Sequence, residues 1–393
     1  MAIATVDPRL QGVVDTFKKS TFGRWQEQEG VRGISDFAIV DVREVELAPW
    51  PRLGVNATFL NLYAMMEGAK GMFVAEIPAG GQTEQQRHLY EQVILILDGE
   101  GTTEIWQQGD AQHHVFEWHR GSAFSPPLNT CYRMFNLGKE PVRFLAVNEA
   151  PMIMNGFRNS DFVFESPYAF RDRFSGEEGF FKQTPPNLET SNWLTNFIPD
   201  FMTSELAPGE FKGSGNFRMQ YRMAGNSLGG HMAEWPTGRY HKAHYHPAGP
   251  VLMGLRSAGY VLIWPKSLGT RPYETGHGDE VVDFKWKQGS LYAPPTGWFH
   301  QHFNTGNEPA RHISVRNAGG GGTGFGPVRP PERLTVTLDV NLGGALIEYE
   351  DEDPEIRRRY EAALRASGVE NQMPSELYEK GSAIRRPDLI PQE

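Results

Sequence analysis

The chain has 393 residues, of which 39% are hydrophobic and 12% aromatic, and its formal net charge is −10. A chain of this length exceeds one compact core and, with this globular composition, indicates two domains. The acidic balance and the absence of a long run of Lys and Arg argue against a nucleic-acid partner.

No segment has the pattern of a membrane span or a signal peptide. The longest apolar runs, such as Val93–Leu97, are far shorter than the roughly 20 residues that cross a bilayer. The first residues lack a basic region followed by an apolar core, so we expect no signal peptide. Cys131 is the single cysteine, which excludes an intramolecular disulfide and favours a reducing compartment. We therefore expect a cytoplasmic protein with no membrane partner.

Residues 1–54 are predicted to form an N-terminal helical extension. Asp7 followed by Pro8 is a helix start signal, because Asp caps the first turn and Pro is tolerated at its first position. The pattern predicts a helix that continues to about Gln28.

The rest of the chain repeats itself once. Gly101–Trp106 matches Gly259–Trp264 at an offset of 158 residues (259 − 101), and Trp118–Pro127 matches Trp286–Pro295 at an offset of 168 (286 − 118). The second copy therefore carries a loop insertion between the two matched blocks. A period of about 160 residues is far too long for a solenoid, so the repeat is a duplicated domain.

Each copy consists of short β-type runs separated by Gly, Pro, Asn or Asp, such as Gln92–Leu97, Thr102–Trp106 and Val142–Asn148. Such strands, with no helix between them, predict an antiparallel sandwich or small barrel. The predicted fold class is all-β, with one such domain at 55–150 and another at 215–318.

Two segments lie outside the copies. The interdomain segment, 151–214, is rich in aromatic residues and proline, which predicts that it packs across the domains and is not a flexible tether. The C-terminal extension, 319–393, contains a second helix signal. Asp353 before Pro354 predicts its start, and Gly368 predicts its end.

Three histidines in the second copy have the spacing of a metal site. His244 and His246 are two residues apart, so in a strand both rings leave the same face of the sheet. His300 follows a Pro-x-Gly turn on another predicted strand. If the two strands pair, three neutral imidazoles converge on one divalent ion and leave its other positions open, as at catalytic metals.

These residues resemble the two motifs that define the cupin family. The second motif is matched at every position, by Gly289, Pro295, Gly297, His300 and Asn304. The first motif is matched at its front, by Gly238, His244 and His246. With the internal repeat, the chain resembles a bicupin. The resemblance implies two cupin domains, each a jelly-roll β-barrel, with helical N- and C-terminal extensions.

The chain departs from the first motif, because the glutamate that follows the histidine pair in the family is missing. Residues 247–251 contain no carboxylate, and the offset of 158 places Gly249 opposite Glu91 of the first copy. An all-histidine site leaves a divalent ion with its full double charge, which favours an anionic, chelating substrate. Cupins of the cysteine dioxygenase and gentisate/salicylate dioxygenase types are similar in using three histidines with ferrous iron. Those that retain the glutamate, such as oxalate decarboxylase, use manganese.

The resemblance therefore implies a non-haem Fe(II)-dependent dioxygenase. Such an enzyme would use O2 to cleave a C–C bond of a small anionic aromatic or enolic substrate chelated to the metal of the second domain. Mn, Zn or Ni are alternatives, because imidazole ligands accept several metals, and they would suit a cupin decarboxylase, isomerase or lyase. A non-catalytic small-molecule-binding bicupin is a further alternative. We also expect a homo-oligomer.

Other residues near the motif are candidates for the rest of the site. His302 shares the face of His300 and is the candidate acid/base group, with a neutral core histidine as the alternative. Trp298 is a candidate for stacking on an aromatic substrate, or else core filler. His241 is predicted on the opposite strand face from His244, or at the barrel mouth in contact with ligand. Arg239 is the preferred guanidinium for binding an anion.

The first copy is predicted to have lost the metal site. The same offsets place Gln86 on His244, His88 on His246 and Tyr132 on His300. An amide, an imidazole and a phenol are a poor ligand set for a divalent cation. We expect a degenerate structural half, with a residual ligand pocket as the alternative.

Overall fold

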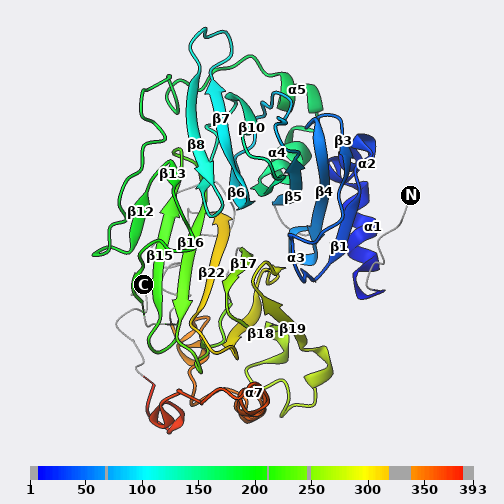
Figure 1. The fold of residues 1–393 in the computed structure, drawn as a ribbon. Helices are drawn as coiled ribbons and strands as arrows, with labels where there is room; N and C mark the ends of the chain where they lie inside the picture. The colour runs from blue at the N-terminus through cyan, green and yellow to red at the C-terminus, as the bar shows by residue number, and fades with distance from the viewer. Residues whose placement is uncertain (1–7, 67–69, 210–211, 246–248, 318–337, 384–393) are drawn as a thin grey trace, which may run out of the picture. The chain divides into compact units, whose positions relative to one another are not determined.

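The computed structural model describes residues 8–66, 70–209, 212–245, 249–317 and 338–383 (Figure 1). Contacts within the chain divide it into two compact units, which we call the first unit and the second unit. The first unit consists of Met1–Asn187, Asn192–Ser204 and Gln220–Gly230. The second unit consists of Leu188–Ser191, Glu205–Met219 and His231–Glu393.

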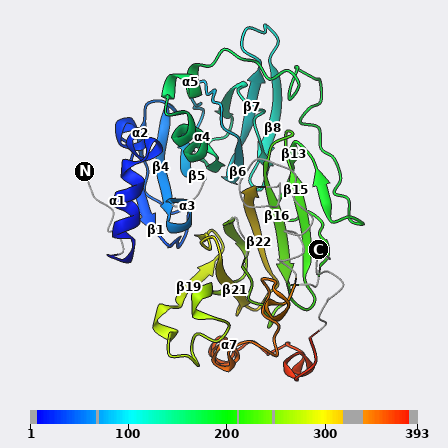
Figure 2. The same ribbon diagram turned by 180° about the vertical axis from the view of Figure 1, so that it is seen from behind.

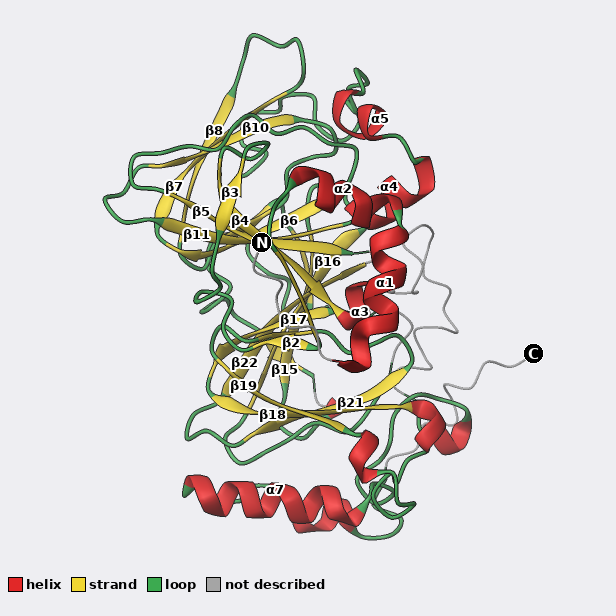
Figure 3. Cartoon of the chain, turned by 90° about the vertical axis from the view of Figure 1, so that its right-hand side faces the viewer, coloured by secondary structure: helices red, strands yellow, loops and turns green. Residues whose placement is uncertain are grey.

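Strands dominate the chain (Figure 3). The strands up to residue 198 are β1 Gly33–Asp36, β2 Ala38–Ile39, β3 Ala48–Trp50, β4 Val55–Leu62, β5 Gly71–Ile77, β6 Gln92–Asp98, β7 Glu100–Trp106, β8 His114–His119, β9 Ala123–Phe124, β10 Cys131–Asn136, β11 Val142–Asn148, β12 Asn192–Leu194 and β13 Phe197–Ile198. The later strands are β14 Ala207–Pro208, β15 Phe217–Arg222, β16 Leu228–Trp235, β17 Val251–Arg256, β18 Ala258–Pro265, β19 Val282–Lys287, β20 Leu291–Tyr292, β21 Trp298–Asn304 and β22 Ala310–Asn317.

The helices are few and short. The α-helices are α1 Gln11–Lys19, α2 Thr21–Glu29, α3 Tyr63–Met66, α4 Ala150–Phe157, α5 Ser160–Glu165 and α7 Pro354–Ser367. The 3-10 turns are η1 Pro8–Leu10, η3 Lys266–Leu268, η4 Gly278–Glu280, η5 Val340–Leu342 and η6 Ser375–Tyr378. Within the described part of the chain, no helix has both the length and the apolar character needed to span a membrane.

The predicted N-terminal helix is two helices, α1 and α2, which meet at Ser20. Ser20 has an extended backbone (φ −66°, ψ 160°), and its hydroxyl accepts a hydrogen bond from Gly23 N at 2.9 Å, so it caps α2. α2 ends at Gly30, which has a φ of 69°. Asp7, the predicted cap, lies outside the described residues. The extension is also not helical throughout, because β1 and β3 both pair with β4.

The first unit is a sandwich of one large and one small sheet. The large sheet has the strand order β1-β4-β5-β11-β6-β9-β13, with β3 also paired to β4, and the small sheet has the order β10-β7-β8. Apart from the parallel β1–β4 pair, the pairings given for these sheets are antiparallel. The predicted all-β jelly-roll architecture is confirmed.

The second unit repeats this topology. Its large sheet contains the order β15-β16-β22-β17-β20, which corresponds to β4-β5-β11-β6-β9, and its small sheet has the order β19-β18-β21, which corresponds to β8-β7-β10. An ion pair joins Arg143 to Glu76 at 2.9 Å in the first unit, and another joins Arg311 to Glu234 at 3.1 Å in the second. These pairs obey the sequence offsets of 168 and 158, so the two copies match in register as well as in strand order.

The segment that follows β11 belongs to the core of the first unit. α4 lies beside α2 (Figure 2), and Asn155 Oδ1 accepts a hydrogen bond from Phe22 N at 2.9 Å. Val163, Phe174 and Phe181 are buried in the apolar cluster of the same unit. Residues 150–181 therefore pack as part of the first unit, and the prediction that the segment packs across the two domains stays a prediction.

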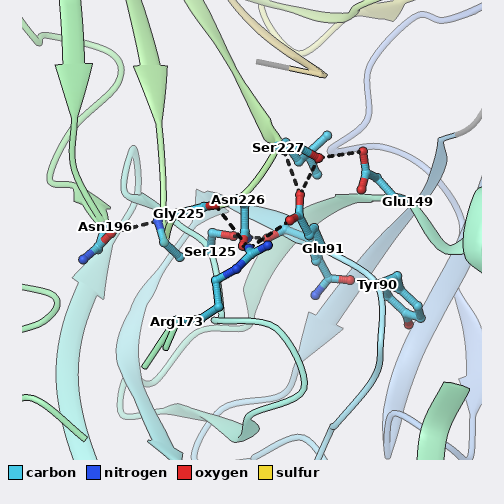
Figure 4. Close-up of polar contacts among 12 residues, drawn as sticks. Tyr90, Glu91, Ser125, Glu149, Arg173, Asn196, Gly225, Asn226 and Ser227 are labelled. Atoms are coloured by element: carbon cyan, nitrogen blue, oxygen red, sulfur yellow. Dashed lines mark hydrogen bonds and ion pairs between the residues drawn. The ribbon is translucent and has the colours of Figure 1, made fainter. Parts of the chain in front are cut away.

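A buried polar cluster explains why Gln220–Gly230 belongs to the first unit, beyond the boundary that we predicted near residue 215 (Figure 4). The Glu91 carboxylate accepts hydrogen bonds from Ser227 Oγ at 2.8 Å and from Leu228 N at 2.9 Å, and it pairs with Arg173 Nη1 at 3.2 Å. Glu91 is buried. Because a buried carboxylate needs such partners, this cluster attaches the segment firmly to the unit.

Replacing Glu91 by Gln should destabilise the protein by about 1–3 kcal/mol, because Arg173 loses its ionic partner and one buried donor loses its acceptor. The measurement is the midpoint of urea unfolding for purified Glu91→Gln and wild-type protein. Glu117→Gln, at an exposed position on β8, is the matched control. Equal midpoints for the two variants would show that the cluster contributes no stability.

The main apolar clusters of the two units lie in different places. In the first unit the cluster fills the interior between the sheets and includes Phe73, Met134 and Phe144. In the second unit the cluster includes Phe299 and Phe303, which alternate along β21 with the histidines of the opposite face. The second unit therefore keeps apolar residues on the outer face of its small sheet.

The C-terminal extension covers this outer face. α7 runs alongside β18 and β21 (Figure 3), and its Ile356, Tyr360 and Leu364 belong to the same apolar cluster. Asp353 caps α7 by accepting a hydrogen bond from Glu355 N at 3.0 Å, and α7 ends before Gly368, as predicted.

Glu352, next to this cap, is a buried carboxyl group. It accepts hydrogen bonds from the Tyr240 hydroxyl and from Gln301 Nε2, the latter at 3.0 Å. Burial raises the pKa of Glu352 to about 7. The unfolded chain releases this proton at a lower pH than the folded chain, so Glu352 reduces stability as the pH rises from about 4.5 to 7.

The variant Glu352→Gln should lose this pH dependence. The stability difference between pH 5 and pH 8 should change by about 3 kcal/mol relative to the wild type, in the direction that favours the variant at pH 8. Chemical unfolding at both pH values measures this difference. Glu376→Gln, at an exposed position in η6, is the control. An unchanged slope for Glu352→Gln would mean that Glu352 stays ionised in the folded protein.

Candidate metal centre

Two of the three predicted ligands, His244 and His300, lie opposite each other inside the second unit, with their rings tilted by 58°. His244 N donates to His300 O at 3.1 Å, and His300 N donates to His244 O at 2.9 Å. Their ring centroids are 4.3 Å apart, and both residues are buried. His244 lies in an isolated bridge and not in the continuous strand that we expected. His246 lies outside the described residues.

The C-terminal extension holds His244 from its other side. Tyr245 N donates to Ala345 O at 3.0 Å, and Ile347 N donates to Ala243 O at 2.8 Å. The main chain around His244 is therefore bonded to β21 on one side and to residues 345–347 on the other. This explains how a histidine outside a regular strand has a defined position.

Both rings are oriented for ligation through Nε2. His244 Nδ1 lies 3.0 Å from Lys242 O, and His300 Nδ1 lies 3.3 Å from Trp298 O. A carbonyl can only accept, so each Nδ1 carries the proton and each Nε2 presents a lone pair. This is the arrangement found at histidines that bind metals. His244 and His300 therefore have the chemistry of two of the three nitrogen ligands that the motif predicts.

A lysine side chain already faces one of these nitrogens. Lys212 Nζ lies 2.7 Å from His244 Nε2, where the lysine side chain can donate a hydrogen bond to the ring lone pair. Burial lowers the pKa of Lys212 well below its usual value, and the charges of Arg218 and Arg316 lower it further. Burial and Lys212 also lower the pKa of His300 to about 3, which keeps its ring in the neutral form that metals bind.

The described residues alone do not complete a metal site. Among them, no group of three or more His, Cys, Asp or Glu side chains has the geometry to hold a metal ion. Two of the predicted ligands are in place, and the third, His246, is outside the described part. The three-histidine centre therefore stays a prediction.

No carboxylate replaces the missing family glutamate in the described stretch 249–251. Glu352 is linked to β21 but bonds to Gln301, which points away from the face of His300. The structure thus agrees with an all-nitrogen donor set as far as its residues are described.

Four further histidines extend from His244 and His300 into the interior of the second unit. The centroid distances are 5.5 Å from His300 to His302, 5.5 Å from His302 to His312, and 5.5 Å from His312 to His231. His241 lies 5.5 Å from His302. We call His231, His241, His302 and His312 the inner histidines.

The predicted position of His241 on the opposite strand face is wrong. His241 N donates to His302 O at 2.9 Å, while His244 N donates to His300 O. The three residue steps from His241 to His244 therefore lie opposite the two steps from His302 to His300, as in a β-bulge. The extra residue turns the His241 side chain towards the interior. The His241 ring packs 4.5 Å from Trp235 and is buried.

The other predicted site residues are His302, Trp298 and Arg239, and each has different surroundings. Burial lowers the pKa of His302 well below its usual value, and its Nδ1 lies 3.1 Å from the Tyr292 hydroxyl, so it is a neutral, hydrogen-bonded ring. Trp298 is half-buried at the start of β21, and its carbonyl orients His300. Arg239 donates to Ser214 Oγ at 2.7 Å, and no described contact joins it to the histidines. The role of Arg239 in binding an anion therefore stays a prediction.

Sequence reasoning missed His231 and His312, although the repeat carried the signal. The offset of 158 places His231 on Phe73, and the offset of 168 places His312 on Phe144. Phe73 and Phe144 lie in the apolar core of the first unit. A histidine at a position where the other copy has a core phenylalanine indicates a polar interior.

The first unit has a hydrogen-bonded phenol at the position that corresponds to His300. Tyr132 pairs with Ile105 as His300 pairs with Ile263, so the two residues share one register. The Tyr132 hydroxyl lies 3.2 Å from His88 Nε2 and accepts a hydrogen bond from Gln92 Nε2 at 2.9 Å. Because His88 Nε2 is engaged by this hydroxyl, the predicted degenerate, structural character of the first copy agrees with its geometry.

Comparisons with known proteins support the cupin fold. Residues 73–148 match the family model of the cupin domain. No curated protein matches the chain. One similar solved structure is of oxalate decarboxylase, described with a reaction specificity switch. It is 11% identical in sequence, the match covers 72% of this chain and 77% of that chain, and the TM-score is 0.45. Another describes Mn(II) centres in oxalate decarboxylase of Bacillus subtilis, with 11% identity, 72% and 78% covered, and a TM-score of 0.46.

The family match covers the first unit's strands from β5 to β11, and the second unit repeats their order and register. Residues 73–148 are thus similar to a cupin domain, and a second domain of the same topology follows them.

Proposed function

We propose that the second unit binds a divalent metal ion through His244, His246 and His300, and that the protein is a metal-dependent enzyme acting on a small anion. The pairing of His244 with His300 carries this proposal, because both rings are buried and both direct Nε2 lone pairs away from the main chain. Three protein ligands would leave positions for a substrate, as in catalytic centres.

When bound, the metal would act as a Lewis acid that orients and polarises a chelated substrate. The chain supplies the surroundings. The nearby charges of Arg218 and Arg316 favour an anionic ligand at this end of the unit. The bonds from β21 and residues 345–347 fix His244, so little ordering is needed on binding.

Two reactions fall within this class. The all-nitrogen donor set supports the oxygen-dependent C–C cleavage that the resemblance implied, because a chelating anion would neutralise the metal charge. The similar solved structures are described as oxalate decarboxylases and give no support to iron or to a dioxygenase. A Mn-, Zn- or Ni-dependent decarboxylase, isomerase or lyase is therefore the second candidate.

Assays with and without dioxygen separate the two reactions. Purified protein loaded with Fe(II), Mn(II), Zn(II) or Ni(II) is incubated with small chelating acids under air and under nitrogen. A dioxygenase consumes oxygen and stops under nitrogen, whereas a decarboxylase releasing CO2 without net oxidation continues. Activity with no metal would contradict both reactions.

The variant His300→Ala should lose bound metal while it stays folded, because the first unit tolerates Tyr132 at the same register. Metal content should fall from about one ion per chain to near zero when one of three ligands is removed. Elemental analysis after dialysis gives this number, and circular dichroism reports the fold. His277→Ala, an exposed histidine of the same unit, is the control and should keep its metal. Retention of metal by His300→Ala would exclude His300 as a ligand.

A further inference from the structure

Gln301 is a fully buried polar residue in an otherwise apolar layer. It lies on the outer face of β21 between Phe299 and Phe303, which belong to the apolar cluster that α7 covers. A methionine or leucine would fill this position without a hydrogen-bonding requirement, whereas a buried amide loses free energy unless it finds partners. Packing alone therefore does not explain the amide.

The Gln301 amide joins β21 to two other segments of the second unit. Its Nε2 donates to His241 O at 2.9 Å and to Glu352 Oε2 at 3.0 Å, so both N–H groups of the amide are used. Because His241 O is a carbonyl and can only accept, it determines which end of the amide points towards it. The first bond reaches the stretch 241–244, and the second reaches the C-terminal extension.

Both bonds begin or end beside the histidines of the candidate metal centre. Gln301 directly follows His300, and the His241 carbonyl belongs to the stretch that leads to His244. This stretch contains the extra residue of the bulge, so regular strand pairing does not hold all of its main chain. The amide therefore fixes the irregular stretch that carries His244 against the strand that carries His300.

Glu352 has partners of its own that keep it beside Gln301. The Tyr240 hydroxyl donates to Glu352 Oε1, and the Tyr378 hydroxyl donates to the Tyr240 hydroxyl at 3.0 Å. Glu352 and Tyr240 are both buried. The acceptor of the second amide bond is thus held by two tyrosines, one of which immediately precedes His241.

The first copy forms the same bulge with a different residue at this position. Thr83 N donates to Met134 O at 2.9 Å, as His241 N does to His302 O. Arg133, which is only half-buried, occupies the register of Gln301. The bulge itself therefore does not require a glutamine. The buried amide is a feature of the copy that carries the three motif histidines.

We propose that Gln301 and Glu352 are positioning residues for the metal centre, which together hold His244 against His300 in the arrangement that one metal ion requires. This inference rests on the proposed metal function. Neither side chain touches the metal in this scheme, because both lie on the outer face of β21. Groups that orient metal ligands in this way change metal affinity by about 10–100-fold when they are removed.

The test replaces both polar partners by apolar residues of similar size. The double variant Gln301→Met/Glu352→Leu should unfold at the same urea concentration as the wild type or at a higher one, because exchanging a buried polar pair for apolar side chains is often neutral or stabilising. Its zinc affinity should nevertheless fall about tenfold or more. Competition with a chromophoric chelator measures the zinc Kd. Gln301→Met alone provides the same comparison if the double variant does not fold.

Tyr360→Phe is the matched control. The buried Tyr360 hydroxyl donates to Asn304 O at 3.0 Å, so this variant also removes a bond between the extension and β21, but at the end of the strand remote from His300. It should lower stability and keep the zinc affinity of the wild type. Glu352→Gln is the conservative replacement. It retains an acceptor for the Gln301 amide and should restore the zinc affinity that the double variant loses.

Metal-free protein gives a second measurement. Nuclear magnetic resonance of protein with isotope-labelled histidine reports the tautomer and surroundings of each imidazole ring. The ring nitrogen signals of His244 and His300 should shift in the double variant and stay unchanged in Tyr360→Phe.

The outcomes separate the two proposals. Unchanged zinc affinity in the double variant, or an equal loss in Tyr360→Phe, would show that the pair contributes only to stability, and the inference is overturned. If the wild type binds no zinc, the proposed metal function fails, and the imidazole signals then decide. Signals that stay unchanged in the double variant overturn the inference, whereas shifted signals show that Gln301 and Glu352 position the two rings.

Discussion

The burial of uncharged imidazoles inside the second unit is the constraint on which its architecture depends. Each neutral ring has one donor and one acceptor, and leaving them unbonded costs free energy. The unit cannot gain its main apolar burial from this interior. It gains it instead on the outer face of β18 and β21, where α7 covers Phe299, Phe303 and their neighbours. A polar interior and an external apolar core are therefore two sides of one arrangement.

This arrangement gives the C-terminal extension a role in the site. Residues 345–347 bond to the main chain beside His244, and Glu352 bonds to Gln301 on the strand that carries His300 and His302. The extension thus supports both histidine segments from behind, without contributing a described side chain to the ligands. Rigid support of this kind is what keeps ligating groups within the small tolerances that metal chemistry needs.

Much of the fold was predictable because a duplicated domain leaves its register in the sequence. The strand order, the capped helix at Asp353 and the facing of His244 with His300 follow from the repeat, from capping chemistry and from motif spacing. The face on which the His241 side chain lies was not predictable from the sequence. One extra residue opposite His302 changes which side chains point inward, and no residue type in the sequence indicates such an extra residue. The attachment of residues 220–230 to the first unit was also hidden, because it depends on Glu91, far away in sequence.

The two copies show that the scaffold does not determine chemistry by itself. Tyr132 and His300 occupy the same register, yet the phenol bonds to His88 and Gln92 while the imidazole directs Nε2 outward from its main chain. Since the neighbouring strands are alike, the difference lies in a few inward-facing side chains. The first unit closes its interior with aromatic rings that need no partner, and the second presents ring nitrogens that do. The same backbone register thus carries two interiors with different hydrogen-bonding needs.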